Sequence, residues 1–329
     1  MEEDKISVIV PAYNAEKTIT KTLRSILGGG YRNVEVLVVD DGSTDKTKTI
    51  VKDLMLHDNR VKLITQSNSG VGVARCKGIQ ESIGEFIAFC DSDDWFEANY
   101  LQEHVKHLEK YKADISICRT QISNLPDIEY SDEISFKDKP DIVKAYVSYD
   151  GISVSLWDKV FRRKVLDTRE ILNDMRYSED IYMNYIACKN ADRIVQFNTT
   201  KYNWFNNMTS LSRGKFNPVK LGNDFEAWNK IIADCNRNYP ELEETALLSS
   251  ELWICGTYRL MVTHHYHNKK QEDMIAKYIR QDGLKVLKAE KNKRNKTFLR
   301  LAYMSFPFAR GVWYFKNGCK TIVKKVIKK

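Results

Sequence analysis

Continuous apolar segments alternate with segments of helically spaced apolar residues along the first part of the chain. Segments 6–10 and 34–39 are apolar except for Ser7 and Glu35, whereas segment 15–27 repeats its apolar residues every three to four positions. The same alternation predicts further strands at 61–65, 85–90 and 114–119 and further helices at 44–56, 71–82 and 97–111. Repeated strand and helix units with mostly apolar strands predict an α/β fold, with a mostly parallel sheet that helices cover on both faces.

The alternation weakens after about residue 124. Helices are predicted at 142–149, 156–166 and 179–189, and strands at 194–198 and 201–205. From Pro218 onward the pattern is helical throughout. We therefore predict an α/β domain at 1–216 and a helical C-terminal region at 217–329.

Carboxylates gather where two of the predicted strands end. They are Asp40 and Asp41 after one strand and Asp91, Asp93 and Asp94 after another. In an open parallel sheet, ligands bind outside the carboxyl ends of the strands, so the two groups are expected at one edge. Like charges this close are costly unless a cation or strong hydrogen-bond donors lie among them. A metal site is therefore favoured over a turn or helix cap, although a turn alone would explain Asp94.

Composition indicates a globular protein of the reducing cytosol. The chain has 329 residues, of which 43% are hydrophobic, and this is enough to form a substantial core. Its seven cysteines are scattered and form no C-x-x-C pair, which argues against a disulfide framework and a zinc site. The acidic start lacks the features of a signal peptide, so a cytoplasmic location is expected.

Positive charge is concentrated at the C-terminal end. Residues 284–329 contain 14 Lys and Arg against one acid, Glu290, and the rest of the chain is net negative although the whole carries +8. Segment 298–315 is rich in aromatic residues but too interrupted by Arg and Pro to span a bilayer. It fits either peripheral binding to an anionic membrane surface, at the inner face of the cell membrane, or a terminal helix packed on the protein. No nucleic-acid partner is expected, because no recognition module is present. The sequence leaves open whether the chain forms a homo-oligomer.

Six motifs, in order along about the first two hundred residues, resemble the family 2 glycosyltransferases of the GT-A fold. They are P-A-Y-N (11–14), V-V-D-D-G-S-T-D (38–45), N-S-G-V-G-V-A-R-C-K-G (68–78), G-E-F-I-A-F-C-D-S-D-D (84–94), W-D-K-V-F (157–161) and S-E-D (178–180). The resemblance implies a Rossmann-like nucleotide-sugar-binding domain and an inverting enzyme of the bacterial surface-glycan type. It says nothing of the last hundred residues.

The resemblance also assigns the donor side of the site. Asp41 is the expected acceptor for the uracil N–H, with Asp93 as the direct ligand of Mn²⁺ or Mg²⁺ and Asp91 nearer the ribose or a metal-bound water. The remaining donor-side candidates are Pro11, Ala12, Tyr13 and Arg75. Hard carboxylate oxygens suit both cations, which commonly bridge to substrate phosphates. The cation would neutralise the departing diphosphate.

The reaction also needs a base, because the acceptor hydroxyl must lose a proton as it attacks. In the family's E-D motif the aspartate has this role, so the resemblance implies that Asp180 is the base, whereas an acidic pair that merely favours the first turn of a helix is the alternative. The acceptor-side candidates are Trp157, Asp158, Lys159 and Glu179. Asp158 and Cys76 stand where relatives often have Asn.

These residues lead us to expect a metal-dependent inverting transferase. It would move a sugar from a UDP-sugar to a hydroxyl of a glycan, lipid-linked or protein-linked acceptor. The alternative is an inactive nucleotide-sugar-binding or scaffold subunit of a glycan assembly complex. The stretch G-V-G-V-A-R (70–75) imitates a dinucleotide fingerprint, but Arg75 stands where the third glycine belongs, which argues against a dehydrogenase.

Overall fold

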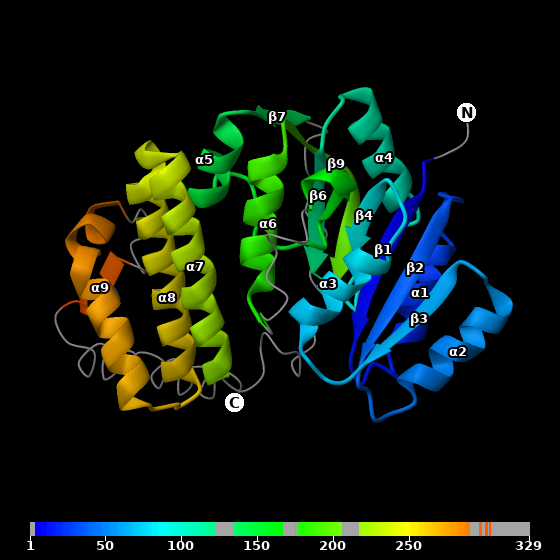
Figure 1. Cartoon of the computed structure of the whole chain (residues 1–329), viewed down its shortest axis with the longest axis horizontal. Helices are drawn as coiled ribbons and strands as arrows, with labels where there is room; N and C mark the ends of the chain where they lie inside the picture. Colours follow the sequence, from blue (N-terminus) through cyan, green and yellow to red (C-terminus); the bar gives the residue numbers. More distant parts are fainter. Residues whose placement is uncertain are drawn as a thin grey trace, which may run out of the picture. The chain divides into compact units, whose positions relative to one another are not determined.

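The computed structural model describes residues 4–122, 134–166, 175, 177–205, 217–289, 296–297, 300–301 and 303. It divides into two compact units, Met1–Asn207 and Met208–Lys329. The boundary predicted at 216 falls at the end of segment 206–216, outside the described residues. Figure 1 shows both units.

A mixed sheet forms the centre of the first unit. Its strands are β1 (Ile6–Ala12), β2 (Val34–Asp41), β3 (Val61–Gln66), β4 (Phe86–Phe89), β5 (Trp95–Phe96), β6 (Ile115–Ile122), β7 (Ser135–Asp138), β8 (Lys159–Arg162) and β9 (Arg193–Trp204). The described strands follow the order β3-β2-β1-β4-β8-β6-β9-β5, and β7 also pairs with β9. The neighbours β3, β2, β1 and β4 are parallel, as the apolar strands predicted.

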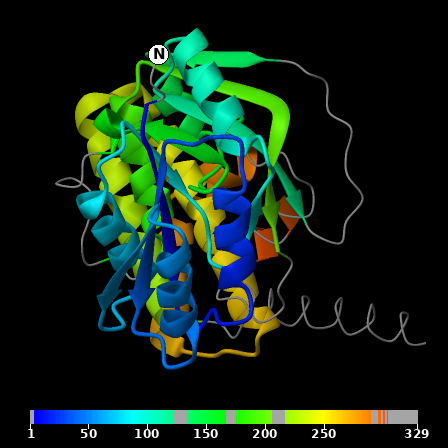
Figure 2. The ribbon, with the colours of Figure 1, turned by 90° about the vertical axis from the view of Figure 1, so that its right-hand side faces the viewer.

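Helices cover both faces of this sheet. They are α1 (Ile19–Leu27), α2 (Thr47–His57), α3 (Val71–Glu81), α4 (Tyr100–Lys110), α5 (Asp141–Val147) and α6 (Glu179–Asn190). Alternate residues of β1 serve opposite faces: Val8 joins the core cluster that contains Leu23 of α1, whereas Ile9 approaches Gly78 of α3. Figure 2 accordingly shows α1 and α3 on opposite sides of the blue strands. The carboxyl ends of β1, β2 and β4 therefore lie between two helical layers.

The helix predicted at 156–166 is wrong. The structure has strand β8 there, antiparallel to both β4 and β6, followed by a short 3₁₀ helix at Arg163–Val165. Apolar residues at 157, 160, 161 and 165 imitate helical spacing, but Val160 and Phe161 are both fully buried because β8 is an inner strand of the sheet. The strands predicted at 194–198 and 201–205 are one long strand, β9, whose pairing with β6 shifts register near its middle.

The second unit is helical, as predicted for the region after Pro218. It contains α7 (Pro218–Asn238), a 3₁₀ helix (Pro240–Leu242), α8 (Glu243–Thr263) and α9 (Lys269–Ala289). Leu221, Ile254 and Ile275, one from each α-helix, are buried in a shared core. No helix in the described part of the chain has both the length and the apolar character needed to cross a membrane. Most of segment 298–315 lies outside the described residues, so both interpretations of the tail stay predictions.

Candidate active site

The predicted donor-side residues meet at one edge of the sheet. Strand β1 runs parallel between β2 and β4, and Ala12 at its end is the register partner of Asp40. Asp91 and Asp93 follow β4 at the same edge. Pro11 and Ala12 are buried at the end of β1, whereas the next side chain, Tyr13, is 50% exposed. The topology thus brings carboxylates from two strands to the place where parallel sheets bind ligands.

The carboxylate of Asp41 is held by the start of α3. The main-chain N–H of Ser69 donates to Oδ1 at 2.7 Å, the N–H of Gly70 donates to Oδ2 at 2.8 Å, and Gln66 Nε2 donates to Oδ1 at 2.8 Å. Gly70 has a φ of +100°, which glycine adopts without strain. A carboxylate has about four acceptor positions, so three internal bonds leave about one for a ligand N–H. This geometry is compatible with the predicted uracil contact, which the structure does not test.

Asp94 ties the acidic motif to β9. Its carboxylate accepts hydrogen bonds from the Tyr202 hydroxyl at 2.6 Å and from the main-chain N–H of Phe205 at 2.7 Å. The N–H of Asp91 donates in turn to the Tyr202 oxygen at 3.1 Å. Burial and the charge of Asp91 raise the pKa of Asp94 to about 8. These contacts give Asp94 a structural role and leave Asp91 and Asp93 as the half-buried acids of the motif.

A buried guanidinium joins the acidic motif to the E-D motif. Arg75 of α3 donates through Nη2 to Asp91 Oδ1 at 2.6 Å and through Nη1 to Glu179 Oε1. Burial lowers the pKa of Arg75, but the charges of Asp91 and Glu179 raise it by a larger amount, so the net shift is upward. Burial also raises the pKa of Glu179 to about 7, against the opposing influence of Arg75. The predicted contact of Arg75 with the donor stays a prediction, because the contacts described here are with carboxylates.

Asp180 lies in the first turn of α6, as the sequence predicted. The helix begins at Glu179, after Ser178, which has a left-handed φ of +60°. Glu179 is buried, whereas Asp180 is half-buried, and its Oδ1 accepts a hydrogen bond from the N–H of Ile181 at 2.9 Å. The positive end of the helix dipole favours the charged form of an acid at this position. Asp180 is therefore partly exposed, and its neighbour Glu179 is connected through Arg75 to Asp91 on the donor side.

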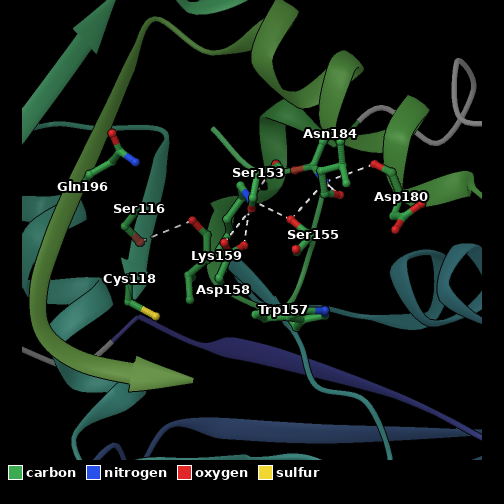
Figure 3. A network of polar contacts seen from close by, with 12 residues as sticks. Ser116, Cys118, Ser153, Ser155, Trp157, Asp158, Lys159, Asp180, Asn184 and Gln196 are labelled. Carbon is green, nitrogen blue, oxygen red and sulfur yellow. Dashed lines mark hydrogen bonds and ion pairs between the residues drawn. The ribbon is translucent and has the colours of Figure 1, made fainter. Parts of the chain in front are cut away.

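Two of the acceptor-side candidates, Asp158 and Lys159, form a polar network within segment 153–159 (Figure 3). Lys159, which is 1% exposed, donates to Asp158 Oδ1 at 2.7 Å, to the Ser155 carbonyl at 2.6 Å and to both oxygens of Ser153. The hydroxyl of Ser153 donates to the other Asp158 oxygen at 2.6 Å. These contacts show Asp158 and Lys159 holding the segment together. Trp157 is half-buried, and its ring stacks on Tyr202 with centroids 4.6 Å apart.

Asn184 of α6 is a site residue that sequence reasoning missed. Its Nδ2 donates to the carbonyls of Val154 at 2.6 Å and Ser155 at 3.0 Å, and also to the carbonyl of Asp180 at 3.1 Å (Figure 3). One buried amide therefore fixes segment 153–158 beside the first turn of α6. No local pattern indicated this contact, because Asn184 belongs to none of the six motifs.

Comparisons with known proteins identify the domain to which the acidic motif belongs. Residues 7–169 match the model of the family described as Glycosyl transferase family 2. These residues form a glycosyl transferase family 2 domain. Relatives of this domain are described as glycosyltransferases, and the fold of the chain is GT-A.

Relatives of the family 2 domain include proteins from two bacteria. Glycosyltransferase GlyA of Streptococcus pneumoniae is 32% identical over 225 residues, which cover 64% of this chain and 32% of GlyA. Uncharacterized glycosyltransferase EpsJ of Bacillus subtilis is 27% identical over 225 residues, which cover 65% of this chain and 64% of EpsJ. The chain thus spans about a third of GlyA and just under two thirds of EpsJ.

A solved structure matches nearly the whole chain. The crystal structure of S. aureus TarS 1-349 in complex with UDP-GlcNAc has a TM-score of 0.69 and 21% sequence identity. The match covers 95% of this chain and 92% of that chain. At this identity the likeness concerns the fold, so the site of the family 2 domain must be judged on its own residues.

The acids of the family 2 domain suit a cation that binds together with a substrate. Among the described residues, no three His, Cys, Asp or Glu side chains form a metal-binding group. The candidate ligands are therefore Asp91 and Asp93, and Arg75 already binds one oxygen of Asp91. Mg²⁺ and related ions often bind through one or two carboxylates, with waters and substrate phosphates completing the shell. The donor set fits such an ion.

Proposed function

We propose that this chain is a metal-dependent inverting glycosyltransferase. It transfers a sugar from a UDP-linked donor to a hydroxyl of a glycan, lipid-linked or protein-linked acceptor. The observation that carries the proposal is the arrangement of two acidic groups around one guanidinium. Arg75 binds Asp91 of the acidic motif on one side and Glu179, the neighbour of Asp180, on the other. A donor-holding group and a candidate base are thus connected within one site.

Three features support a UDP-sugar as the donor. Asp41 retains acceptor capacity at the edge of the sheet, and the exposed ring of Tyr13 lies in the turn that follows β1. The turn is itself tied down, because the N–H of Asn14 donates to Ser43 Oγ at 2.9 Å. The TarS structures with a similar fold are described as complexes with UDP and UDP-GlcNAc. A rigid turn with an exposed aromatic ring suits a nucleotide base.

Asp180 is proposed to accept the proton of the acceptor hydroxyl. A half-buried carboxylate can meet both a substrate and solvent, and attack by the activated hydroxyl on the anomeric carbon displaces UDP with inversion. Asp93, with Asp91, would hold Mn²⁺ or Mg²⁺, which supplies neutralisation of the charge that develops on the diphosphate. Trp157 and segment 153–158 are proposed to border the acceptor, because Asn184 holds that segment beside Asp180.

The setting proposed for this reaction is bacterial surface polysaccharide assembly in the cytoplasm. Attachment of the tail to the inner face of the cell membrane belongs to the same proposal. Both parts rest on the sequence rather than on the described residues.

The proposal is tested by measuring nucleotide release from a panel of UDP-, GDP- and CDP-sugars with Mn²⁺. We expect UDP release from at least one UDP-sugar and a loss of this release in Asp93→Ala. Release of GDP or CDP alone would reassign the donor. If UDP binds but no UDP-sugar is consumed, the inactive binding subunit becomes the better interpretation.

A further inference from the structure

Arg75 is enclosed by the parts of the site that bind the donor and the parts that carry the base. Its side chain lies in the second turn of α3 and is 8% exposed. One arm of the guanidinium contacts Asp91, which follows β4, and the other contacts Glu179, which begins α6. Since Glu179 lies 104 positions away in the sequence, this contact joins two distant segments through a single side chain.

The start of α3 is fixed on both sides, so Arg75 has little freedom to move. On the donor side, the N–H of Gly70 is bound by Asp41 at 2.8 Å. On the base side, Gly72 packs so closely that a Cβ there would lie 2.0 Å from the Met175 carbonyl oxygen and 2.9 Å from Glu179 Cβ. The start of α3 is therefore held at a fixed distance both from Asp41 on the donor side and from Glu179 on the base side.

We infer that Arg75 is a positioning residue that sets Asp180 against the donor-binding acids by clamping Asp91 and Glu179 together. This inference rests on the proposed function, because it takes Asp180 as the base. It differs from a direct donor contact, in which Arg75 would bind the nucleotide sugar itself. Asp180 follows Glu179 in the same helical turn, so a shift of Glu179 moves the base with it.

The clamp requires a guanidinium. Arginine presents several N–H donors in a rigid planar fork and can bind two carboxylates at once, whereas the single ammonium of lysine is a compact charge on a flexible stem. A lysine at this position would keep the charge but hold the two carboxylates less firmly. Asp91 has a second anchor through its N–H to Tyr202. The loss should therefore fall mainly on the Glu179 side, and so on the base.

The test compares Arg75→Lys with Arg163→Lys. Arg163 is a matched control because its guanidinium also bridges two partners, the Gly84 carbonyl at 2.7 Å and Ser82 Oγ at 3.0 Å, at the opposite end of β4. UDP release from UDP-GlcNAc, with water in place of the acceptor, gives kcat and KM, and calorimetry with UDP and Mn²⁺ gives Kd. We expect Arg75→Lys to lower kcat at least about tenfold, with KM and Kd within about threefold of the unmodified values. Arg163→Lys should change none of the three quantities.

A double-variant cycle separates positioning from simple loss of stability. Glu179→Gln removes the charge that Arg75 clamps but keeps the shape of the side chain. If the clamp acts as one unit, adding Arg75→Lys to Glu179→Gln should lower kcat by less than about threefold. Losses that multiply, or a rise in KM and Kd with unchanged kcat, would overturn the inference; the second result would make Arg75 a donor ligand.

Asp180→Asn shows which proposal has failed if the results disagree. It should abolish UDP release while leaving the Kd for UDP unchanged, which establishes that the assay reports on the base. UDP-glucose and UDP-galactose replace UDP-GlcNAc if the latter is not consumed. No release from any UDP-sugar of the panel by the unmodified chain, or no effect of Asp180→Asn, contradicts the proposed function and the inference with it. If Asp180→Asn abolishes UDP release as expected but Arg75→Lys leaves kcat unchanged, only the inference about Arg75 is contradicted.

Discussion

Gly72 is the position at which one added methyl group should separate the two halves of the site. The Cβ of an alanine there would lie 2.0 Å from the carbonyl oxygen of Met175 and 2.9 Å from Glu179 Cβ. Real Cβ atoms essentially never come within 3.0 Å of a non-bonded heavy atom, so the two main-chain segments must separate by at least about 1 Å. Because Asp41 anchors the start of α3, the movement should fall on Met175 and on the first turn of α6, which carries Glu179 and Asp180.

The expected consequence is a defect in turnover rather than in donor binding. Misplacement of a reacting group by about 1 Å costs on the order of 100-fold in rate, so Gly72→Ala should lower kcat for UDP release from UDP-GlcNAc by about that factor. The Kd for UDP with Mn²⁺ should stay within about threefold, because Asp41 and Asp93 lie outside the displaced segment. Steady-state kinetics and calorimetry, run below the melting temperature of the variant, measure the two quantities.

Gly78→Ala, in the same helix, is the control. Its Cβ would meet Ile9 Cγ2 at 2.4 Å, which is a side-chain atom of the core beneath the sheet. We expect a loss of about 1–3 kcal/mol in the free energy of unfolding, with kcat retained by the folded protein. A Gly72→Ala enzyme with kcat within about threefold of the unmodified chain would refute the reasoning. So would an equal loss of kcat in both variants.

Three further predictions concern other parts of the chain. Asn184→Ala should lower the free energy of unfolding by about 1–3 kcal/mol and speed amide exchange in 153–158, unlike Asn190→Ala, which loses one bond to the Val165 carbonyl; equal effects would contradict this. Burial raises the pKa of Glu35, but its hydrogen bonds lower the pKa by a larger amount, so the net shift is downward. The stability that Glu35 contributes is therefore complete above its pKa in the unfolded chain and is lost as the pH falls through its pKa in the folded protein. The stability gap between the unmodified chain and Glu35→Gln should therefore shrink between about pH 6 and pH 3 in urea unfolding, and a constant gap would argue against this. The full chain should sediment with anionic liposomes and a chain ending at Ala289 should not, whereas no sedimentation of either at low salt would rule out membrane binding.

Local sequence patterns predicted the positions of the acids well. An apolar run that ends in acids indicates both a buried strand and the edge at which it ends, which placed Asp41, Asp91 and Asp93 before the fold was known. The E-D pair likewise fell at the start of a helix, where acids are favoured. These features depend on residues within a few positions of one another.

The contacts that join these acids could not be predicted in the same way. Arg75 and Glu179 are 104 positions apart, and Tyr202 and Asp94 are 108 apart, so only the folded topology brings them together. The strand β8 was predicted as a helix because its apolar spacing suits either structure, and its pairing with β4 and β6 decided the outcome. The local pattern could identify the chemical groups of the site but could not identify their partners.

The most direct test of the proposed mechanism is a comparison of Asp93→Ala with Asp180→Asn by calorimetry with UDP and Mn²⁺, alongside turnover of a UDP-sugar. Asp93 is proposed to hold the donor diphosphate through the cation, whereas Asp180 is proposed to act on the proton of the acceptor. We predict that Asp93→Ala loses Mn²⁺-dependent UDP binding, and that Asp180→Asn binds UDP like the unmodified chain but no longer transfers the sugar. Equal loss of UDP affinity in both variants would contradict the account, because Asp180 would then be a structural or donor-binding residue.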